Sequence, residues 1–102
     1  MNTATTLHTI NKTSAQTSAL QDCLAAICDG DALLLIENGV YAAMPAQALT
    51  FTRLPGSVQC YVLSEDCVAR GIDQQLSPEF QVIDYDDFVA LSCRHSKVVS
   101  WF

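Results

Sequence analysis

Basic residues are scarce in this chain of 102 residues: five Lys and Arg stand against eleven Asp and Glu, which leaves a formal net charge of −6. Affinity for a nucleic-acid backbone grows with the number of Lys and Arg contacts. The composition therefore argues against direct binding of nucleic acid. Linkers, internal repeats and low-complexity stretches are absent too, so we expect a single domain over residues 1–102, with residues 1–6 as a flexible leader.

Long hydrophobic runs are also missing. No apolar segment approaches the roughly 20 residues needed to cross a bilayer. The first residues lack the basic start and the apolar segment of a signal peptide. Half of the residues are nevertheless hydrophobic, which is enough for the core of one domain. We therefore expect a soluble protein of the cytoplasm that has no membrane partner.

Paired metal-binding or disulfide motifs are absent as well. The cysteines are odd in number and contain no C-x-x-C pair: Cys23, Cys28, Cys60, Cys67 and Cys93. Reduced thiols in a cytosol fit this pattern better than a disulfide framework or a zinc ribbon. His8 and His95 lie far apart with no spaced set of partners, so we expect hydrogen-bonded or solvated histidines and no metal site. We expect no cofactor either.

The stretch Asp31–Ala43 carries the clearest structural signal. Its apolar run over 32–36 is short and unbroken, which is typical of a strand buried on both faces of a parallel sheet. Glu37, Asn38 and Gly39 follow directly, at the carboxyl end of that strand. In open α/β sheets, sites and partner contacts collect at this edge. With only one glycine, the turn does not resemble a phosphate-binding loop, and we interpret it as shaping a contact edge.

Strands and short helices alternate through the rest of the chain. We expect strands at 6–10, 58–63, 80–83 and 98–102, and helices at about 19–27, 40–44, 64–70 and 84–93. Ser18 with Gln21 resembles a capping box, Ser64 resembles an N-cap, and the acids from Asp84 to Asp87 favour capping over paired-carboxylate catalysis. The pattern predicts an α/β fold, a mostly parallel sheet with helices on both faces, whose last strand packs its aromatic residues against neighbours.

Several separated blocks of the chain resemble one family. They are Leu7-His8-Thr9, Gly30 to Leu35, Glu37 to Ala43, Val62-Leu63 with Glu65-Asp66, Ala69-Arg70-Gly71, Ile83-Asp84-Tyr85 with Phe88-Val89 and Leu91, Arg94-His95, and Trp101. In this order and spacing, from about Leu7 to Trp101, the sequence resembles the DsrH/TusB family of sulfur-relay subunits.

The resemblance implies that this chain is an accessory and scaffold subunit rather than the principal catalyst. Such a subunit would assemble with TusC/DsrF-like and TusD/DsrE-like subunits into a heterohexamer. The TusB branch passes persulfide sulfur toward 2-thiolation of the wobble uridine of tRNA, and the DsrH branch serves oxidative sulfur metabolism. The essential sulfur-carrying cysteine belongs to the TusD/DsrE partner. Residues expected at a family motif or partner edge are Glu37, Asn38, Gly39, Tyr41, Asp66, Arg70, Asp84 and Tyr85.

Cys23 is the one candidate for thiol chemistry of the chain's own. It falls where DsrH-like members carry a cysteine, so it is a candidate persulfide acceptor. A persulfide carrier needs an exposed and electrostatically favoured thiolate. Asp22 adjoins Cys23, no Lys or Arg is near in sequence, and the stripe of Leu20, Leu24 and Ile27 suggests burial. Both interpretations, a small buried hydrophobe and a sulfur carrier, remain open from the sequence.

Overall fold

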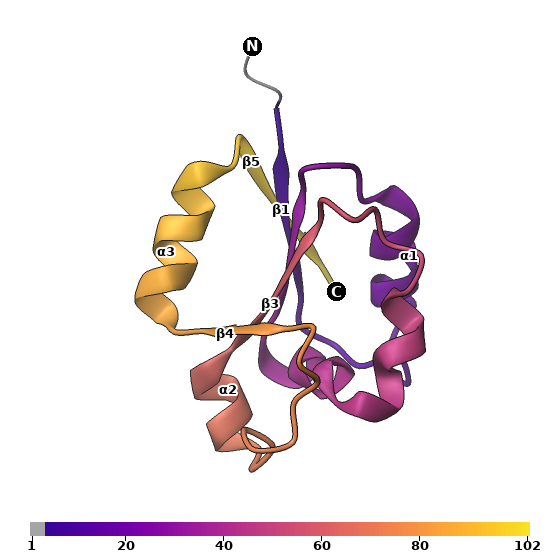
Figure 1. Cartoon of the computed structure of the whole chain (residues 1–102), viewed down its shortest axis with the longest axis vertical. Coiled ribbons are helices and arrows are strands. Elements are labelled where there is room, and N and C mark those ends of the chain that lie inside the picture. Colours follow the sequence, from indigo (N-terminus) through magenta and orange to yellow (C-terminus); the bar gives the residue numbers. More distant parts are fainter. Residues whose placement is uncertain (1–3) are drawn as a thin grey trace.

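The computed structural model describes residues 4–102, so the first three residues of the predicted leader lie outside the described part. Five strands and three α-helices alternate, with two 3₁₀ segments, η1 and η2, after the second strand (Figure 1). Their bounds are β1 Thr6–Ile10, α1 Ala19–Ala26, β2 Ala32–Leu35, η1 Glu37–Ala43, η2 Pro45–Phe51, β3 Gln59–Leu63, α2 Ser64–Ala69, β4 Gln81–Ile83, α3 Tyr85–Arg94 and β5 Lys97–Trp101. Thr6, the last residue of the predicted leader, is the first residue of β1.

The five strands form one sheet in the order β4-β3-β2-β1-β5, and every neighbouring pair is parallel. The predicted α/β class with a parallel sheet is therefore confirmed. The chain moves in one direction from β1 to β4 and then crosses back to place β5 beside β1. Because parallel crossovers are right-handed, this reversal puts α3 on the opposite face of the sheet from the earlier connections.

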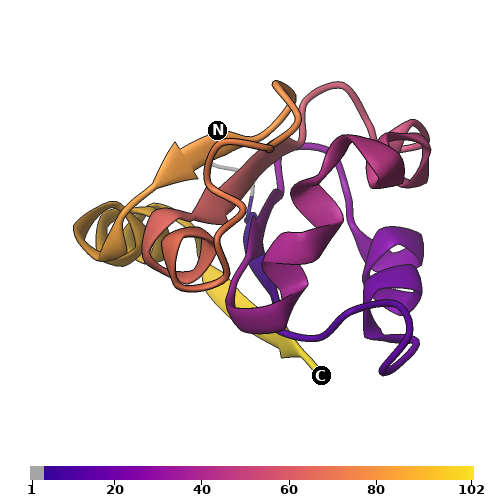
Figure 2. The same ribbon diagram turned by 90° about the horizontal axis from the view of Figure 1, so that it is seen from below.

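Figures 1 and 2 show the two faces. On the α1 face, Leu33 and Leu35 of β2 belong to a core cluster that also includes Leu20 and Cys23 of α1. On the α3 face, Ala32 and Leu34 of β2 join a smaller cluster. All four residues of β2 are buried, which confirms a strand covered on both sides. The period of two along the strand distributes its side chains between the two cores.

Two of the three predicted helix caps are wrong. The Ser18 backbone is near-helical rather than extended, and its hydroxyl donates to Asp22 Oδ2 at 3.0 Å instead of accepting from the helix. Ser64 already lies inside α2, because that helix begins immediately after β3 and has no side-chain cap. Asp84 does form a capping box with Asp87 at the start of α3, as predicted.

The last strand is at the sheet edge, as predicted. The two aromatic residues at this end of the described chain, Trp101 and Phe102, differ in how far they are buried. Trp101 is half-buried against the α1-face core. Phe102, which follows β5, is 77% exposed, so the expectation that it packs against neighbours is wrong. Within residues 4–102, none of the helices has both the length and the apolar character required to cross a membrane.

Candidate functional site

The carboxyl edge of the sheet is built around the start of η1. Glu37 has a φ of +50°, a left-handed conformation that is uncommon for residues other than glycine. Its backbone N–H donates to Asp66 Oδ2 at 2.6 Å. The carboxylate at the start of α2 therefore holds the strained turn that follows β2, and such strain persists only where surrounding contacts fix it.

Arg70 joins η1 to α2 at the same edge. Its Nε donates to Asn38 Oδ1 at 3.0 Å, and its Nη1 donates to the Asp66 backbone oxygen at 3.2 Å. Nη1 also lies 3.9 Å from Asp66 Oδ1. The predicted residues Glu37, Asn38, Asp66 and Arg70 thus come together in one polar network.

Gly39 fixes how closely η1 approaches β1. A Cβ at this position would lie 2.2 Å from the backbone oxygen of Ile10. That oxygen already accepts a hydrogen bond from the Ile36 N–H at 2.9 Å. Only glycine allows this backbone contact, because any side chain would push η1 away from the end of β1.

The other predicted edge residues lie near this network rather than inside it. The Tyr85 N–H donates to Glu65 Oε2 at 3.3 Å, which ties the start of α3 to α2. The Asp84 side chain is engaged in its own helix cap. Tyr41 and Tyr85 are 38% and 53% exposed. The carboxyl edge therefore combines a rigid polar centre with exposed tyrosines.

Cys23 lies away from this edge, inside the α1-face core. Its side chain is fully buried. Burial and the nearby Asp31 carboxylate raise the pKa of the Cys23 thiol to about 12. The thiol is neutral at physiological pH and has no access to solvent, so in this conformation it lacks both properties that a persulfide carrier needs. Cys28, by contrast, is exposed.

A series of hydrogen bonds that joins the buried Asp31 and His8 to the half-buried Trp101 was not predicted as a unit. The indole Nε1–H of Trp101 donates to His8 Nδ1 at 3.0 Å. Since indole is only a donor, His8 carries its proton on Nε2 and donates it to Asp31 Oδ2 at 2.9 Å. Asp31 also accepts from the backbone N–H groups of Thr6 and Cys28, at 2.9 and 3.0 Å.

The Asp31 carboxylate is therefore fully engaged. Burial alone would raise the pKa of Asp31, but the hydrogen bonds from His8, Cys28 and Thr6 together hold it below its usual value. These hydrogen bonds join β1, β5 and the turn before β2, so they have a structural function. The available sequence signal was His8, an imidazole in the middle of the predicted strand 6–10. Among residues 4–102, no group of three or more His, Cys, Asp or Glu side chains could hold a metal ion.

Comparison with known proteins agrees with the block pattern of the sequence. The family described as "DsrH like protein" matches residues 12–98 of this chain. Protein TusB of Pectobacterium parmentieri is 36% identical over 95 residues, which cover 93% of this chain and 99% of that protein. The TusB proteins of Escherichia coli O139:H28 and Shigella boydii serotype 18 are each 35% identical over the same length and coverage. This chain therefore belongs to the DsrH/TusB family.

Proposed function

We propose that this chain is an accessory and scaffold subunit of a cytoplasmic sulfur-relay complex that supports 2-thiolation of the tRNA wobble uridine. Its partners in this proposal are TusC/DsrF-like and TusD/DsrE-like subunits, and sulfur is carried by the latter. Family membership supplies the sulfur-relay context. The three relatives named above are all TusB proteins, which favours the tRNA branch over the oxidative DsrH branch.

The observation that supports the scaffold role is the burial of the Cys23 thiol. A fully buried thiol whose pKa is raised to about 12 cannot attack a persulfide donor without a conformational change. This argues against the alternative in which Cys23 itself accepts and passes on sulfur. The chain then contributes through its surfaces.

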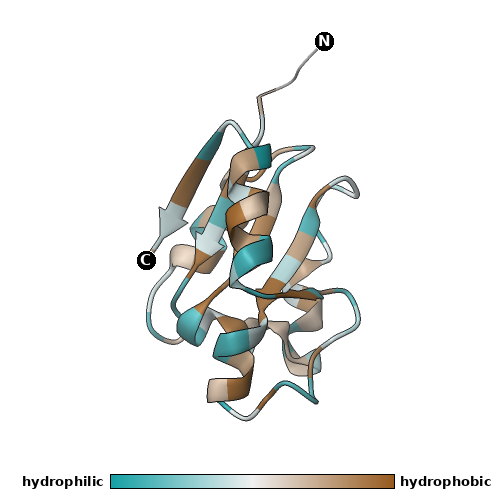
Figure 3. Cartoon of the chain, turned by 90° about the vertical axis from the view of Figure 1, so that its left-hand side faces the viewer, coloured by the Kyte–Doolittle hydropathy of each residue, from teal (hydrophilic) through white to brown (hydrophobic). Residues whose placement is uncertain are grey.

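Exposed apolar side chains on and near α3 are consistent with partner contacts. Val89 is 65% exposed, Tyr85 is 53% exposed, and Val98 on the neighbouring β5 is 44% exposed. Figure 3 faces α3 and shows hydrophobic segments among hydrophilic ones. Aromatic residues are enriched in the buried centres of interfaces between subunits, and charged residues are depleted there.

Co-purification tests the scaffold role. The tagged chain, expressed together with TusC-like and TusD-like subunits, is expected to retain both partners through size-exclusion chromatography at about 1 µM protein. Subunits that elute separately under these conditions would contradict the proposal. Val89→Glu should weaken this retention, whereas Leu49→Glu, the same kind of change at an 84% exposed position of η2, serves as a control.

Sulfur loading tests the rejected alternative directly. The assembled complex is incubated with a persulfide donor, and the added sulfur is located by peptide mass mapping. We expect none on Cys23, and we expect Cys23→Ala to leave transfer to the acceptor unchanged. A persulfide on Cys23, together with loss of transfer in that variant, would make this chain a sulfur carrier.

A further inference from the structure

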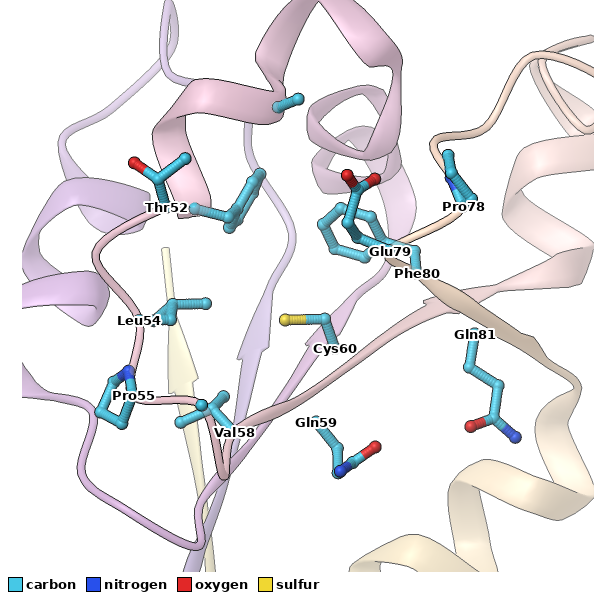
Figure 4. A pocket seen from close by; sticks show the side chains of 13 residues that line it. Thr52, Leu54, Pro55, Val58, Gln59, Cys60, Pro78, Glu79, Phe80 and Gln81 are labelled. Carbon is cyan, nitrogen blue, oxygen red and sulfur yellow. The ribbon is translucent and has the colours of Figure 1, made fainter.

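A surface hollow of about 600 Å³ lies at the amino ends of β3 and β4. The end of η2 and the loop 52–58 form one side, and residues 78–81 form the other. Figure 4 shows Cys60 between Leu54 and Phe80, with its sulfur directed into the space between these sides. This volume lies in the range of small-molecule sites. We call it the Cys60 hollow.

The interior of the Cys60 hollow is apolar. Phe51 and Phe80 meet edge to face, with ring centroids 5.0 Å apart and an interplanar angle of 84°. Leu54 and Val58 are half-buried beside them. Burial raises the pKa of the Cys60 thiol to about 11, so this group adds no charge at physiological pH. An aromatic body would find edge and face contacts with the two phenylalanine rings.

Polar groups stand at the rim. Thr52, Gln59, Glu79 and Gln81 line the hollow and are exposed. Glu79 is the only charged side chain among the described residues that line it. One of its oxygens, Oε2, accepts from the Ser77 hydroxyl, and the other can accept a further donor. The rim therefore carries one negative charge in a chain whose net charge is also negative.

We propose that the Cys60 hollow binds a small molecule with an aromatic body and a protonated amine. The ring packs against Phe51 and Phe80, and the ammonium group pairs with the Glu79 carboxylate. A carboxylate at the same place on the ligand would meet like charge. Because the ion pair is exposed to water, it adds only a modest preference for the amine.

Two probes with the same ring and opposite charge test this site. The isotope-labelled full chain is titrated with tryptamine and with indolepropionate while the backbone amide resonances are followed. We expect the shifts to gather at Phe51, Cys60 and Phe80, and we expect tryptamine to bind about two- to fivefold more tightly. Equal affinities, shifts elsewhere on the molecule, or no saturation by tryptamine near about 1 mM would overturn the proposal.

Variants separate the roles of charge and space. Glu79→Gln should remove the preference for the amine while both probes still bind, whereas Asp86→Asn removes a charge on α3 and should preserve it. Cys60→Trp fills the hollow and should abolish binding of both probes. Thr52→Trp, at an exposed rim position, provides a second obstruction if Cys60→Trp fails to fold. Undiminished tryptamine binding in a folded filling variant would refute the assigned location.

Discussion

The two faces of the sheet are covered very differently. On the α1 face, residues from α1, η1 and α2 join the strands in a cluster of thirteen buried residues, which includes the thiols of Cys23 and Cys67. The cluster on the α3 face has six buried residues, and Leu91 is the only buried residue of α3. The difference follows from topology, because the single reversal between β4 and β5 sends only one helix to the second face.

This asymmetry indicates that the two faces have different roles: the α1 face stabilises the fold, and the α3 face is available for association. The α1 face contains the close backbone approach at Gly39 and the larger of the two clusters of buried residues. The α3 face combines thin cover with exposed Val89 and Val98. Elements with few buried contacts open most readily and are frequently the ones that engage partners. We therefore expect the largest losses of stability from substitutions on the first face, and effects on assembly from substitutions of the exposed residues on the second.

The largest effect is expected from Gly39→Ala. The new Cβ would lie 2.2 Å from the Ile10 oxygen, so η1 must move and the neighbouring hydrogen bond must lengthen. We expect the free energy of unfolding to fall by more than about 3 kcal/mol, as for severe overpacking. Urea denaturation measures it. Gly56→Ala is the control, since its Cβ would meet nothing within 4 Å. A loss under about 1 kcal/mol for Gly39→Ala would contradict the close approach.

Leu91→Ala tests the thin cover of the α3 face. Leu91 is 3% exposed and belongs to the cluster with Leu7 and Leu34. We expect a loss of about 2–3 kcal/mol, because the truncation leaves a cavity under α3. Hydrogen exchange should show faster opening confined to α3. Val89→Ala, at a 65% exposed position of the same helix, should change stability by less than about 0.5 kcal/mol. Equal losses in the two variants would contradict this arrangement.

Alkaline pH should lower the free energy of unfolding through ionisation of Cys23, which lies in the core of the α1 face. Its folded-state pKa is raised to about 12 from an ordinary value of 9.0, so below pH 9 the thiol is protonated in both states. Between pH 9 and about 12 the unfolded chain loses this proton while the folded chain keeps it, which lowers the free energy of unfolding. The expected contribution at pH 10 is about 1 kcal/mol.

Denaturation at pH 8 and pH 10 measures this effect. Cys23→Ala should reduce the loss of stability between the two pH values. Cys93→Ala, which removes an exposed thiol, should leave it unchanged. A pH dependence identical in the wild type and in Cys23→Ala would show that the Cys23 thiol ionises equally in both states.

Local signals predicted most of the fold. The unbroken apolar run of β2 indicated burial on both faces, and the strand over Thr6–Ile10 was predicted with its observed bounds. Alternating strands and helices then indicated a parallel sheet. The edge residues that the family resemblance implied, Glu37, Asn38, Asp66 and Arg70, come together as well, because the carboxyl ends of adjacent parallel strands meet at one edge of the sheet.

Contacts between residues that are far apart in the sequence could not be predicted from such local signals. The hydrogen bond between His8 and Trp101 spans 93 positions, and its existence depends on β5 returning beside β1. The approach of Gly39 to Ile10 likewise requires the path of η1 across the end of β1. The predicted Ser18 cap is wrong because the Ser18 hydroxyl donates to the Asp22 carboxylate, a competition that the cap pattern does not encode.

The smallest expected effect concerns the helix caps and compares α3 with α1. The Asp84 side chain accepts from the Asp87 N–H at 2.8 Å, and Asp87 accepts in return at 3.2 Å. Asp84→Ala should therefore lower the free energy of unfolding by about 0.5–1 kcal/mol and increase fraying of the first turn of α3. Ser18→Ala should cost less, because Ser18 forms no cap bond to α1. Thermal unfolding monitored by circular dichroism gives both values. A larger loss for Ser18→Ala would mean that α1, despite its deeper core, depends on its first turn more than α3 does.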